Sequence, residues 1–581
     1  MRLAALAGAL LLAFQDAPAP DRDRSPCDVA ISADGRWALT ANAASDSVSL
    51  VDLSDGTVAA EAAVGKGPCS VALTPDGRRA VVTNRASKSV SVLGVGVGAL
   101  SVHQTVVVGH EPRGIAIDGA RAFIVLSGED AVVALDLESL KVTARIEVGV
   151  EPWHAALAPD GKRLAVGNAL SQDVSVVDTE AMRVERTVKV RGRNLRRVAV
   201  SPDGEWAYVP TVAERGLGTT RDNIDKGWVI ANRLARVRLT KAATREAIAL
   251  DVRGQAVADL EAVAMSADGQ SLAVAAGGTH ELLLMRGPLP FVGHGGPGDH
   301  IERALLEDAK RFRRVTLGGR PVSARFSPDG KSVVVANALL NAVQVVDVET
   351  GKVARTIALG GPAQPSRERR GEAIFYDGTR SFRQWYSCHS CHAEGHTNGG
   401  AYDTFGDGRY GNPKKTPSLR GVTKTGPWTW HGSQRDLRES IRATFKTTMQ
   451  GAEPSGEDLD AVVAFLATVD FAPPRDEAVT EGARRGKALF RAKGCQDCHA
   501  APHFTSELVA EVGLESKDDA HKGFNPPALR GVGRRGPWLH DGRARTLEEV
   551  LRTHHAPSRA NGEKDLTEEE LRDVVEYLKT L

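Results

Sequence analysis

Apolar and polar positions alternate in short runs through the first 360 residues. The stretch VALTPDGRRAVVTNRASKSVSV, which begins at Val71, contains two alternating segments joined by an Asp-Gly pair, and it recurs with small changes. Alternation with a period of two predicts β-strands with one buried face, and an Asp-Gly pair between two such runs predicts a hairpin turn. The Asp-Gly pairs begin at Asp34, Asp76, Asp118, Asp160, Asp203, Asp268 and Asp329.

Each repeat is long enough to hold four strands. The first five Asp-Gly pairs are about 42 residues apart, and a third strand such as SVSLVDL and a last strand such as KVARTIAL complete the unit. Four short strands in a unit of this length are typical of a β-propeller blade. The repeats therefore predict an all-β propeller of seven blades over residues 20–364.

Two of the predicted blades are enlarged. The last two gaps between Asp-Gly pairs grow to about 65 and 61 residues, with insertions around residues 214–233 and 291–312. Long insertions often carry function. These insertions are either surface elaborations or elements that dock the following domain or a partner.

The residues at one position of the repeat, one from each blade, are expected to surround a mouth of the central channel. This mouth is either a binding rim or an ordinary polar opening. Two cysteines occupy the position in neighbouring blades, where they either form a disulfide, if their Cα atoms lie within about 7 Å, or stay as free thiols. The position is filled by Cys27, Cys69, Arg113, Trp153, Arg196, Glu261 and Val322.

The first 19 residues have the features of a secretory signal peptide. Arg2 precedes an apolar run from Leu3 to Phe14, and small residues follow near Ala17 and Ala19. The run is too short to span a bilayer, although a retained anchor is the alternative interpretation. We therefore expect an exported, periplasmic protein with no membrane span.

The charge balance argues against some classes of partner. The chain has 74 Lys and Arg against 73 Asp and Glu, a net charge of +1. A protein that binds nucleic acid or an anionic membrane usually carries an excess of basic residues. We therefore expect no nucleic-acid partner.

Two Cys-x-x-Cys-His runs, SCHSCHAEGH and GCQDCHAAPH, follow the propeller repeats. This arrangement matches the attachment site of c-type haem, in which the two thiols bond to the haem and the histidine ligates the iron. A shared zinc site is disfavoured because the two cysteine pairs are about 107 residues apart, and a redox Cys-x-x-Cys pair needs no histidine. We expect two covalently attached haem c groups, one at Cys388, Cys391 and His392 and one at Cys495, Cys498 and His499.

The two haem sites lie in duplicated segments. Residues 417–444 align without gaps on residues 527–554, at a constant offset of 110. Helical patterns flank both sites, at residues 368–376 and 455–469 in one copy and 481–494 and 566–581 in the other. We therefore predict two mostly α-helical cytochrome c domains, over residues 365–475 and 476–581.

These features resemble known families. The repeats, with AVVTN and SVVVANA as examples, resemble the Tyr-Val-Thr-Asn (YVTN) propellers. Residues 366–581, with the pattern LRGV, PW, HDG and TLEEVL, resemble the di-haem cytochrome c peroxidase and MauG superfamily. The second resemblance implies an oxidoreductase that reduces hydrogen peroxide, or oxidises a partner, with electrons from a small cytochrome or copper protein.

The resemblance also implies roles for several residues. Trp430 fits the place of a tryptophan between the two haems, with core packing as the alternative role. The distal ligand of the second haem falls on His554, with His555 as the alternative. This second haem would then have two histidine ligands, which should lower its potential relative to methionine ligation.

The catalytic residues of the peroxide site are harder to carry over. The family places a glutamate where this chain has Thr448, so Glu453 and His431 are the remaining candidates for moving a proton. Met449 could instead ligate the first iron and leave no open site.

Four functions therefore stay open: a peroxidase, an electron-transfer protein, a redox sensor or scaffold whose propeller binds a partner, and MauG-like oxidation of a partner held by the propeller. The propeller could also bind a protein or small-molecule ligand. Two aspartates in AYDTFGDGRYGN, which starts at Ala401, make a calcium ion between the haem domains possible.

Overall fold

The computed structural model describes residues 21–240, 244–293, 296–471, 479–534 and 536–581. The expected signal peptide lies outside the described residues. The described part of the chain contains no helix that is both long and apolar enough to cross a membrane.

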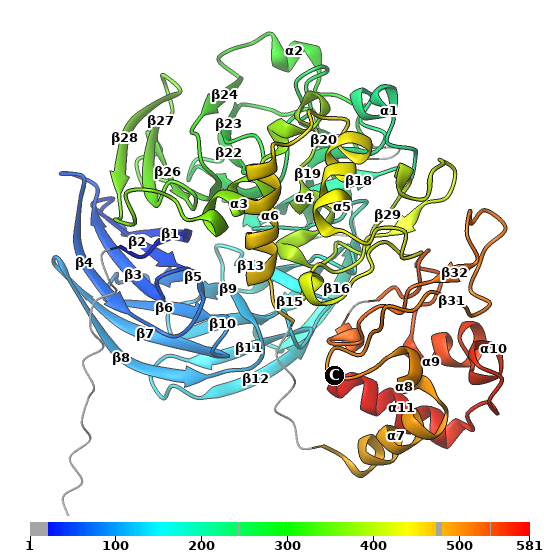
Figure 1. Cartoon of the computed structure of the whole chain (residues 1–581). Helices are drawn as coiled ribbons and strands as arrows, with labels where there is room; N and C mark the ends of the chain where they lie inside the picture. The colour runs from blue at the N-terminus through cyan, green and yellow to red at the C-terminus, as the bar shows by residue number, and fades with distance from the viewer. Residues whose placement is uncertain (1–20, 241–243, 294–295, 472–478, 535) are drawn as a thin grey trace, which may run out of the picture.

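Seven four-stranded antiparallel sheets form a ring around a central axis (Figure 1). The predicted fold, a seven-bladed propeller followed by helical domains, is therefore confirmed. The first four blades are β1 (Pro26–Ile31), β2 (Trp37–Asn42), β3 (Ser47–Asp52) and β4 (Thr57–Ala63); β5 (Pro68–Leu73), β6 (Arg79–Asn84), β7 (Ser89–Gly96) and β8 (Ala99–Val107); β9 (Pro112–Ile117), β10 (Arg121–Leu126), β11 (Ala131–Asp136) and β12 (Val142–Glu147); and β13 (Pro152–Leu157), β14 (Arg163–Asn168), β15 (Asp173–Asp178) and β16 (Arg183–Lys189).

The other three blades continue the same order. They are β17 (Ala199–Val200), β18 (Trp206–Glu214), β19 (Ile230–Arg238) and β20 (Arg245–Ala249); β21 (Leu260–Met265), β22 (Ser271–Ala276), β23 (Glu281–Arg286) and β24 (Phe312–Thr316); and β25 (Pro321–Phe326), β26 (Ser332–Asn337), β27 (Ala342–Asp347) and β28 (Lys352–Ala358). The first strand of each blade is innermost, and β1 contacts both β5 and β25, so the ring closes.

An asparagine at the end of the second strand explains part of the repeat motif. Asn42 Nδ2 donates to Ser49 Oγ on the third strand at 2.8 Å, and Asn84 Nδ2 donates to Ser91 Oγ at 3.0 Å. Both asparagines are fully buried, so these bonds satisfy polar groups inside the sheet.

The helices of the haem-site region follow the last blade. The first copy has α3 (Arg367–Phe375), α4 (Cys388–Cys391), α5 (Leu437–Ala443) and α6 (Gly456–Thr468), and the second has α7 (Glu481–Ala492), α8 (Cys495–Cys498), α9 (Leu547–Glu549), α10 (Pro557–Ala560) and α11 (Glu568–Thr580). In each copy the first and last helices pack together, α3 on α6 and α7 on α11. Short 3-10 turns are η1 (Gly378–Arg380), η2 (Phe382–Gln384), η3 (Ala393–Gly395), η4 (Phe405–Asp407), η5 (Val422–Lys424) and η7 (Val532–Arg534), and two small sheets are β29 (Ala401–Tyr402) with β30 (Lys414–Lys415) and β31 (Ala510–Glu511) with β32 (Gly523–Phe524).

The first helical copy packs directly on the propeller (Figure 1). Ile224, in the short helix α1 (Arg221–Asp225), and Ile230 of β19 share one buried apolar cluster with Phe375 and Trp385 of the first copy. The insertion at residues 214–233 therefore docks the following domain. The second insertion contains α2 (Arg303–Leu306), whose Leu305 packs inside the propeller with Leu283 and Phe312.

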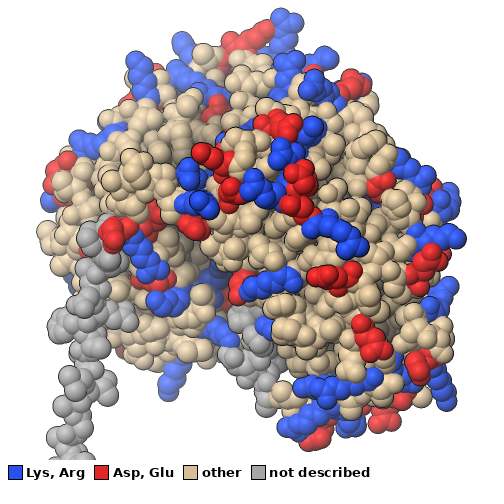
Figure 2. Space-filling view, viewed as in Figure 1, with Lys and Arg blue, Asp and Glu red and all other residues tan. Residues whose placement is uncertain are grey.

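The surface carries both signs of charge. Figure 2 shows basic and acidic side chains interspersed over the face that it presents. This mixture agrees with the nearly balanced composition.

A buried carboxylate joins the first and last blades. Asp28 has no exposed surface and accepts hydrogen bonds from Ser70 Oγ at 2.5 Å and Ser323 Oγ at 2.7 Å. Arg197 Nη1 lies 3.0 Å from its Oδ2. Burial alone would raise the pKa of Asp28, but Arg197 and Arg325 outweigh burial and hold the pKa at about 2.

We expect Asp28→Asn to destabilise the propeller. The folded-state pKa lies below the ordinary value, so the ionised group contributes stability above about pH 4 that is lost as the pH falls towards 2. The contribution is about 2 kcal/mol, and Arg197 would also lose its partner. Denaturant unfolding followed by far-UV circular dichroism should show this loss at pH 7 and a smaller difference from wild type below pH 4.

A matched control is Asp55→Asn, at an exposed turn of the same blade where the amide can still accept from Thr57. It should change the free energy of unfolding by less than about 0.5 kcal/mol. Equal stability of Asp28→Asn and wild type at pH 7 would contradict the closing role of Asp28.

Candidate functional site

The first Cys-x-x-Cys-His run is clamped by the propeller. Helix α4 begins after Ser387, whose side chain caps it. The hydroxyls of Ser387 and Ser390 both donate to Asp259, each at 2.5 Å, and Asn194 Nδ2 donates to the Ser390 carbonyl at 2.7 Å. The propeller therefore fixes the short helix that carries Cys388 and Cys391.

His389, one of the two residues between the cysteines, reaches the mouth of the channel. His389 is 1% exposed, and its Nε2 lies 3.1 Å from Arg196 Nη2 and 3.4 Å from Glu261 Oε1. Burial lowers the pKa of His389, which favours the neutral imidazole. Arg196 also stacks over Trp153, with its guanidinium carbon 4.0 Å from the ring centroid. Two other predicted rim residues differ in their contacts. Arg113 also stacks over the Trp153 ring, whereas Val322 packs in the core between the last and first blades.

The two rim cysteines are free thiols in this structure. Cys27 Sγ donates to the Pro68 carbonyl at 3.1 Å, and Cys69 Sγ donates to the Pro112 carbonyl at 3.2 Å. Each thiol thus bonds to the next blade.

The two histidines that follow the cysteine pairs each have Nδ1 beside a backbone carbonyl. His392 Nδ1 lies 3.0 Å from the Pro417 carbonyl, and His499 Nδ1 lies 3.1 Å from the Phe504 carbonyl. Burial lowers the pKa of each to about 4, so both rings are neutral at physiological pH. A hydrogen bond at Nδ1 leaves Nε2 free for a metal, which is the usual orientation of an iron-ligating histidine.

Matching apolar side chains line the two sites. Burial raises the pKa of Cys388 to about 12 and that of Cys495 to about 11, so both are protonated thiols within apolar surroundings. These walls, free thiols and neutral histidines fit a c-type haem at each site. The wall residues that correspond at an offset of 110 are Leu419 and Leu529, Val422 and Val532, Trp428 and Trp538, Leu437 and Leu547, and Ile441 and Leu551.

A π-helical turn follows the wall helix of each copy, and Met449 and His555 come directly after these turns. These turns are η6 (Thr444–Thr448) and η8 (Val550–His554). Met449 N–H bonds to the carbonyl of the first residue of η6 at 2.9 Å, and His555 N–H makes the same bond in η8 at 2.7 Å. Such turns occur often at functional sites.

The two candidate histidines of the second site differ in their surroundings. Within the described residues, His555 Nδ1 is buried without a hydrogen-bond partner, and His555 is close enough to His499 to lower its pKa. His554 instead lies with Nε2 3.6 Å from Glu549 Oε1 and is partly exposed. Met449, at the first site, is 2% exposed and packs with Phe445 and the cysteines.

Trp430 of the first copy packs against His540, the residue at the corresponding position of the second copy. An offset of 110 relates Trp430 to His540, and the two ring centroids are 6.4 Å apart in an edge-to-face arrangement. Lys415 N–H donates to the His540 carbonyl at 2.6 Å, and Asn525 N–H, at the equivalent position, donates to the Trp430 carbonyl at 2.9 Å. The two copies thus pair through reciprocal contacts, as in a pseudo-twofold dimer.

His431 belongs to the same interface. Its Nδ1 lies 2.8 Å from the Gly523 carbonyl, and its buried Nε2 has no hydrogen-bond partner among the described residues. Burial lowers the pKa of His431. The fully buried carboxylate of Asp519 lies beside it, 3.8 Å from Nε2, and accepts from Asn412 Nδ2 at 2.9 Å.

The sequence interpretation did not single out His540 and Asp519. His540 Nε2 lies 3.0 Å from Asp519 Oδ2, and Lys414 also pairs with this carboxylate. The gapless alignment of the two copies carried a signal for His540, because it set this residue opposite Trp430. Asp519 lies in a segment that the alignment does not cover.

The other predicted residues lie apart from these clusters. Glu453 is exposed and pairs with Arg442 at 2.8 Å and Lys446 at 3.4 Å. The Arg442 hydrogen bond lowers the pKa of Glu453, so it is an ionised surface carboxylate. The Thr448 carbonyl accepts from the buried hydroxyl of Tyr386 at 2.6 Å.

The aspartates suggested for calcium have other contacts. Asp403 accepts from the N–H groups of Gly411 at 2.8 Å and Asn412 at 3.3 Å. Asp407 accepts from Asn412 Nδ2 at 3.1 Å. No group of three or more potential metal-binding side chains comes together in the part of the chain that the structure describes.

Three family descriptions match separate parts of the chain. Residues 115–244 match the YNCE-like beta-propeller, residues 365–479 the di-haem cytochrome c peroxidase family, and residues 483–581 the cytochrome c family. The matches agree with the fold and with both haem sites.

Several curated proteins are similar to parts of this chain. The methylamine utilization protein MauG of Methylorubrum extorquens is 26% identical over 285 residues, covering 38% of this chain and 79% of that protein. The gamma subunit of hydrazine synthase from Kuenenia stuttgartiensis is 28% identical over 279 residues, covering 38% and 79%. The cytochrome c551 peroxidase of Nitrosomonas europaea is 23% identical over 327 residues, covering 47% and 92%.

These matches and the paired haem sites lead to one assignment. The C-terminal part of the chain resembles the di-haem cytochrome c peroxidase and MauG superfamily and follows a seven-bladed β-propeller, and these matches support an oxidoreductase with c-type haem.

Proposed function

We propose that this protein reduces hydrogen peroxide with electrons from a small cytochrome or copper protein. One peroxide, two electrons and two protons give two water molecules. The haem groups supply the redox chemistry when bound, with electron entry at Cys495–Cys498 and peroxide reduction at Cys388–Cys391. The chain holds, orients and connects these two sites.

The observation that carries this proposal is the contact between Trp430 and His540. It lies at the junction of the two copies, each of which holds one haem site. Trp430 Nε1 donates to the Lys415 carbonyl at 2.7 Å, which fixes the indole in place. An aromatic pair in this position offers electrons a short path between the sites.

Proton movement is assigned to His431. Its Nδ1 faces a carbonyl, so the ring hydrogen lies there and the neutral Nε2 can accept a proton. Glu453 is less suited because Arg442 and Lys446 hold it as a surface carboxylate.

A second candidate function is electron transfer without turnover. The burial of Met449 and of His555 Nδ1 favours it, because a ligand from each position would leave neither iron open. A third function is oxidation of a partner held by the propeller. Because His389 and Glu261 fill the mouth of the channel, this partner would have to bind another face of the propeller.

The proposal also includes a cellular location and a calcium ion. The N-terminal signal and the chemistry of haem attachment support a periplasmic location. A calcium ion between the haem domains stays a prediction.

The test that separates peroxidase from electron carrier is low-temperature EPR on the protein after one-electron reduction, with peroxide consumption on the same sample. The peroxidase proposal predicts a high-spin ferric signal from the first site and turnover with a reduced small cytochrome. Low-spin signals alone, without peroxide consumption, would overturn it in favour of electron transfer.

We assign the distal ligand of the second site to His555. His555→Ala should therefore convert one low-spin haem signal to high spin, while His554→Ala, one residue away, should leave both signals unchanged. Both variants keep His499 and its cysteines. The opposite result, a change in His554→Ala only, would return the ligand role to His554.

We expect Trp430→Phe to slow electron passage between the haems. The change removes the indole N–H that anchors the ring to Lys415. A roughly tenfold loss corresponds to about 1.4 kcal/mol of barrier. Flash-reduction kinetics would measure it.

The matched control for this variant is Trp37→Phe in the first blade, which should leave the electron-transfer rate unchanged. Full haem content in both proteins would show that the sites remain intact. A wild-type rate in Trp430→Phe would reduce Trp430 to a packing role.

A further inference from the structure

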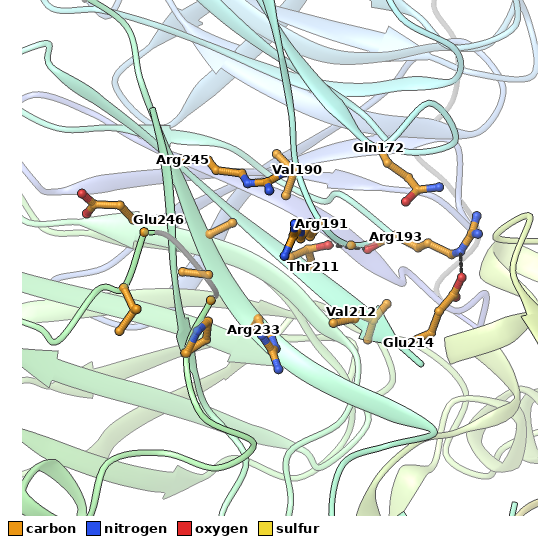
Figure 3. A pocket seen from close by; sticks show the side chains of 18 of the residues that line it. Gln172, Val190, Arg191, Arg193, Thr211, Val212, Glu214, Arg233, Arg245 and Glu246 are labelled. Atoms are coloured by element: carbon orange, nitrogen blue, oxygen red, sulfur yellow. Dashed lines mark hydrogen bonds and ion pairs between the residues drawn. The ribbon is translucent and has the colours of Figure 1, made fainter. Parts of the chain in front are cut away.

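A cavity of about 420 Å³ opens at the side of the propeller, between the end of the fourth blade and strands β18 to β20 of the fifth (Figure 3). Five arginines and two glutamates are among the residues that line it. Cavities of this size are typical of sites for small molecules.

Some of these charges already have partners. Arg193 Nε donates to Glu214 at 2.6 Å, as the dashed line in Figure 3 shows, and Arg193 Nη1 donates to the Asn398 carbonyl at 3.3 Å. Arg215 pairs with Asp299. Glu246 accepts from Arg236 Nε at 2.8 Å. Both glutamates of the cavity are thus neutralised.

Three arginines of the lining form no ion pair with a carboxylate among the described residues: Arg191, Arg233 and Arg245. The buried Nε of Arg233 makes no hydrogen bond within the described part of the chain. Arg245 donates to the Lys189 carbonyl at 3.2 Å, which is an uncharged group. A buried donor without an acceptor is rare in native proteins unless a ligand or water completes it.

The positive charges also act on one another. Burial and the neighbouring Arg215 lower the pKa of Arg233, against the opposite effect of the carboxylates of Asp251 and Asp299, and burial and the neighbouring Arg191 lower the pKa of Arg245. An anionic group beside Arg191 and Arg245 would relieve their repulsion, and an acceptor beside Arg233 would supply its missing hydrogen bond.

Apolar side chains also line the cavity, together with the polar Gln172 and Thr211. Val190, Val212 and Val292 contribute side chains, and Ala235 and Ala247 lie with them. A bare inorganic ion would leave this surface uncovered. The cavity is better matched by an anionic head at the arginines joined to a compact apolar body.

We propose that this cavity is a binding site for a small organic carboxylate, with Arg191, Arg233 and Arg245 as the carboxylate-binding residues and the valines in contact with the apolar part. The site lies on the propeller and is distinct from both haem sites. It therefore does not rest on the peroxidase proposal.

Isothermal titration calorimetry on the full-length di-haem protein tests this site with phthalate, an aromatic dicarboxylate, as the probe. Benzamide, which is similar in shape but neutral, is the matched ligand control. Arg233→Gln should weaken phthalate binding by at least about tenfold, the loss typical of one charge-assisted hydrogen bond. Arg191→Gln, at an exposed rim position, should also weaken it and gives a second variant if Arg233→Gln does not fold.

The protein control is Arg78→Gln, which removes the same charge from an exposed hairpin of the second blade. It should bind phthalate as the wild type does. Saturable binding of phthalate but not benzamide, lost in the cavity variants and kept in Arg78→Gln, is the expected result. Absence of saturable binding, equal binding of benzamide, or equal affinity in all variants would overturn the proposal.

Discussion

The buried charges at the mouth of the propeller determine how the two halves of the chain fit together. Glu261 lies in this mouth with 6% of its surface exposed, and Arg320 Nη2 donates to it at 2.8 Å. Arg320 also lies 3.3 Å from Glu394, in the turn that follows the first cysteine pair. A buried charge without a partner costs several kcal/mol, so these groups must be satisfied together. The helical copy supplies partners that the propeller lacks.

This constraint explains the position of the first haem site. Asp259 holds the serines on both sides of Cys388, and Arg320 stacks over Tyr376, with its guanidinium carbon 3.5 Å from the ring centroid. The attachment helix is only four residues long and could not hold its orientation alone. The propeller thus acts as a rigid support for a haem site, in addition to any ligand of its own.

The period of the strands and the Cys-x-x-Cys-His runs predicted the propeller and both haem attachment sites, because each depends on local patterns. The docking of α4 on the mouth was not predicted. Arg196 and Glu261 were placed on a rim, but the residue they contact, His389, is 193 positions from Arg196 in the chain. Contacts between residues so far apart in the chain produce no repeating pattern in the sequence, so they could not be predicted from it. The choice between His554 and His555 likewise depends on a π-helical turn, which shifts the register by one residue beyond what a count along a regular helix gives.

The two copies share their walls but differ where their π-helical turns end. Equivalent wall residues, and a backbone carbonyl beside Nδ1 of each histidine that follows a cysteine pair, would give two similar sites. Met449 follows the first turn and His555 follows the second, yet the offset of 110 that relates the walls sets His554 opposite Thr444, at the start of the first turn and not at its end. A thioether and an imidazole would give an iron different potentials, so ligands from these two positions would make the sites differ in potential although their walls are repeated.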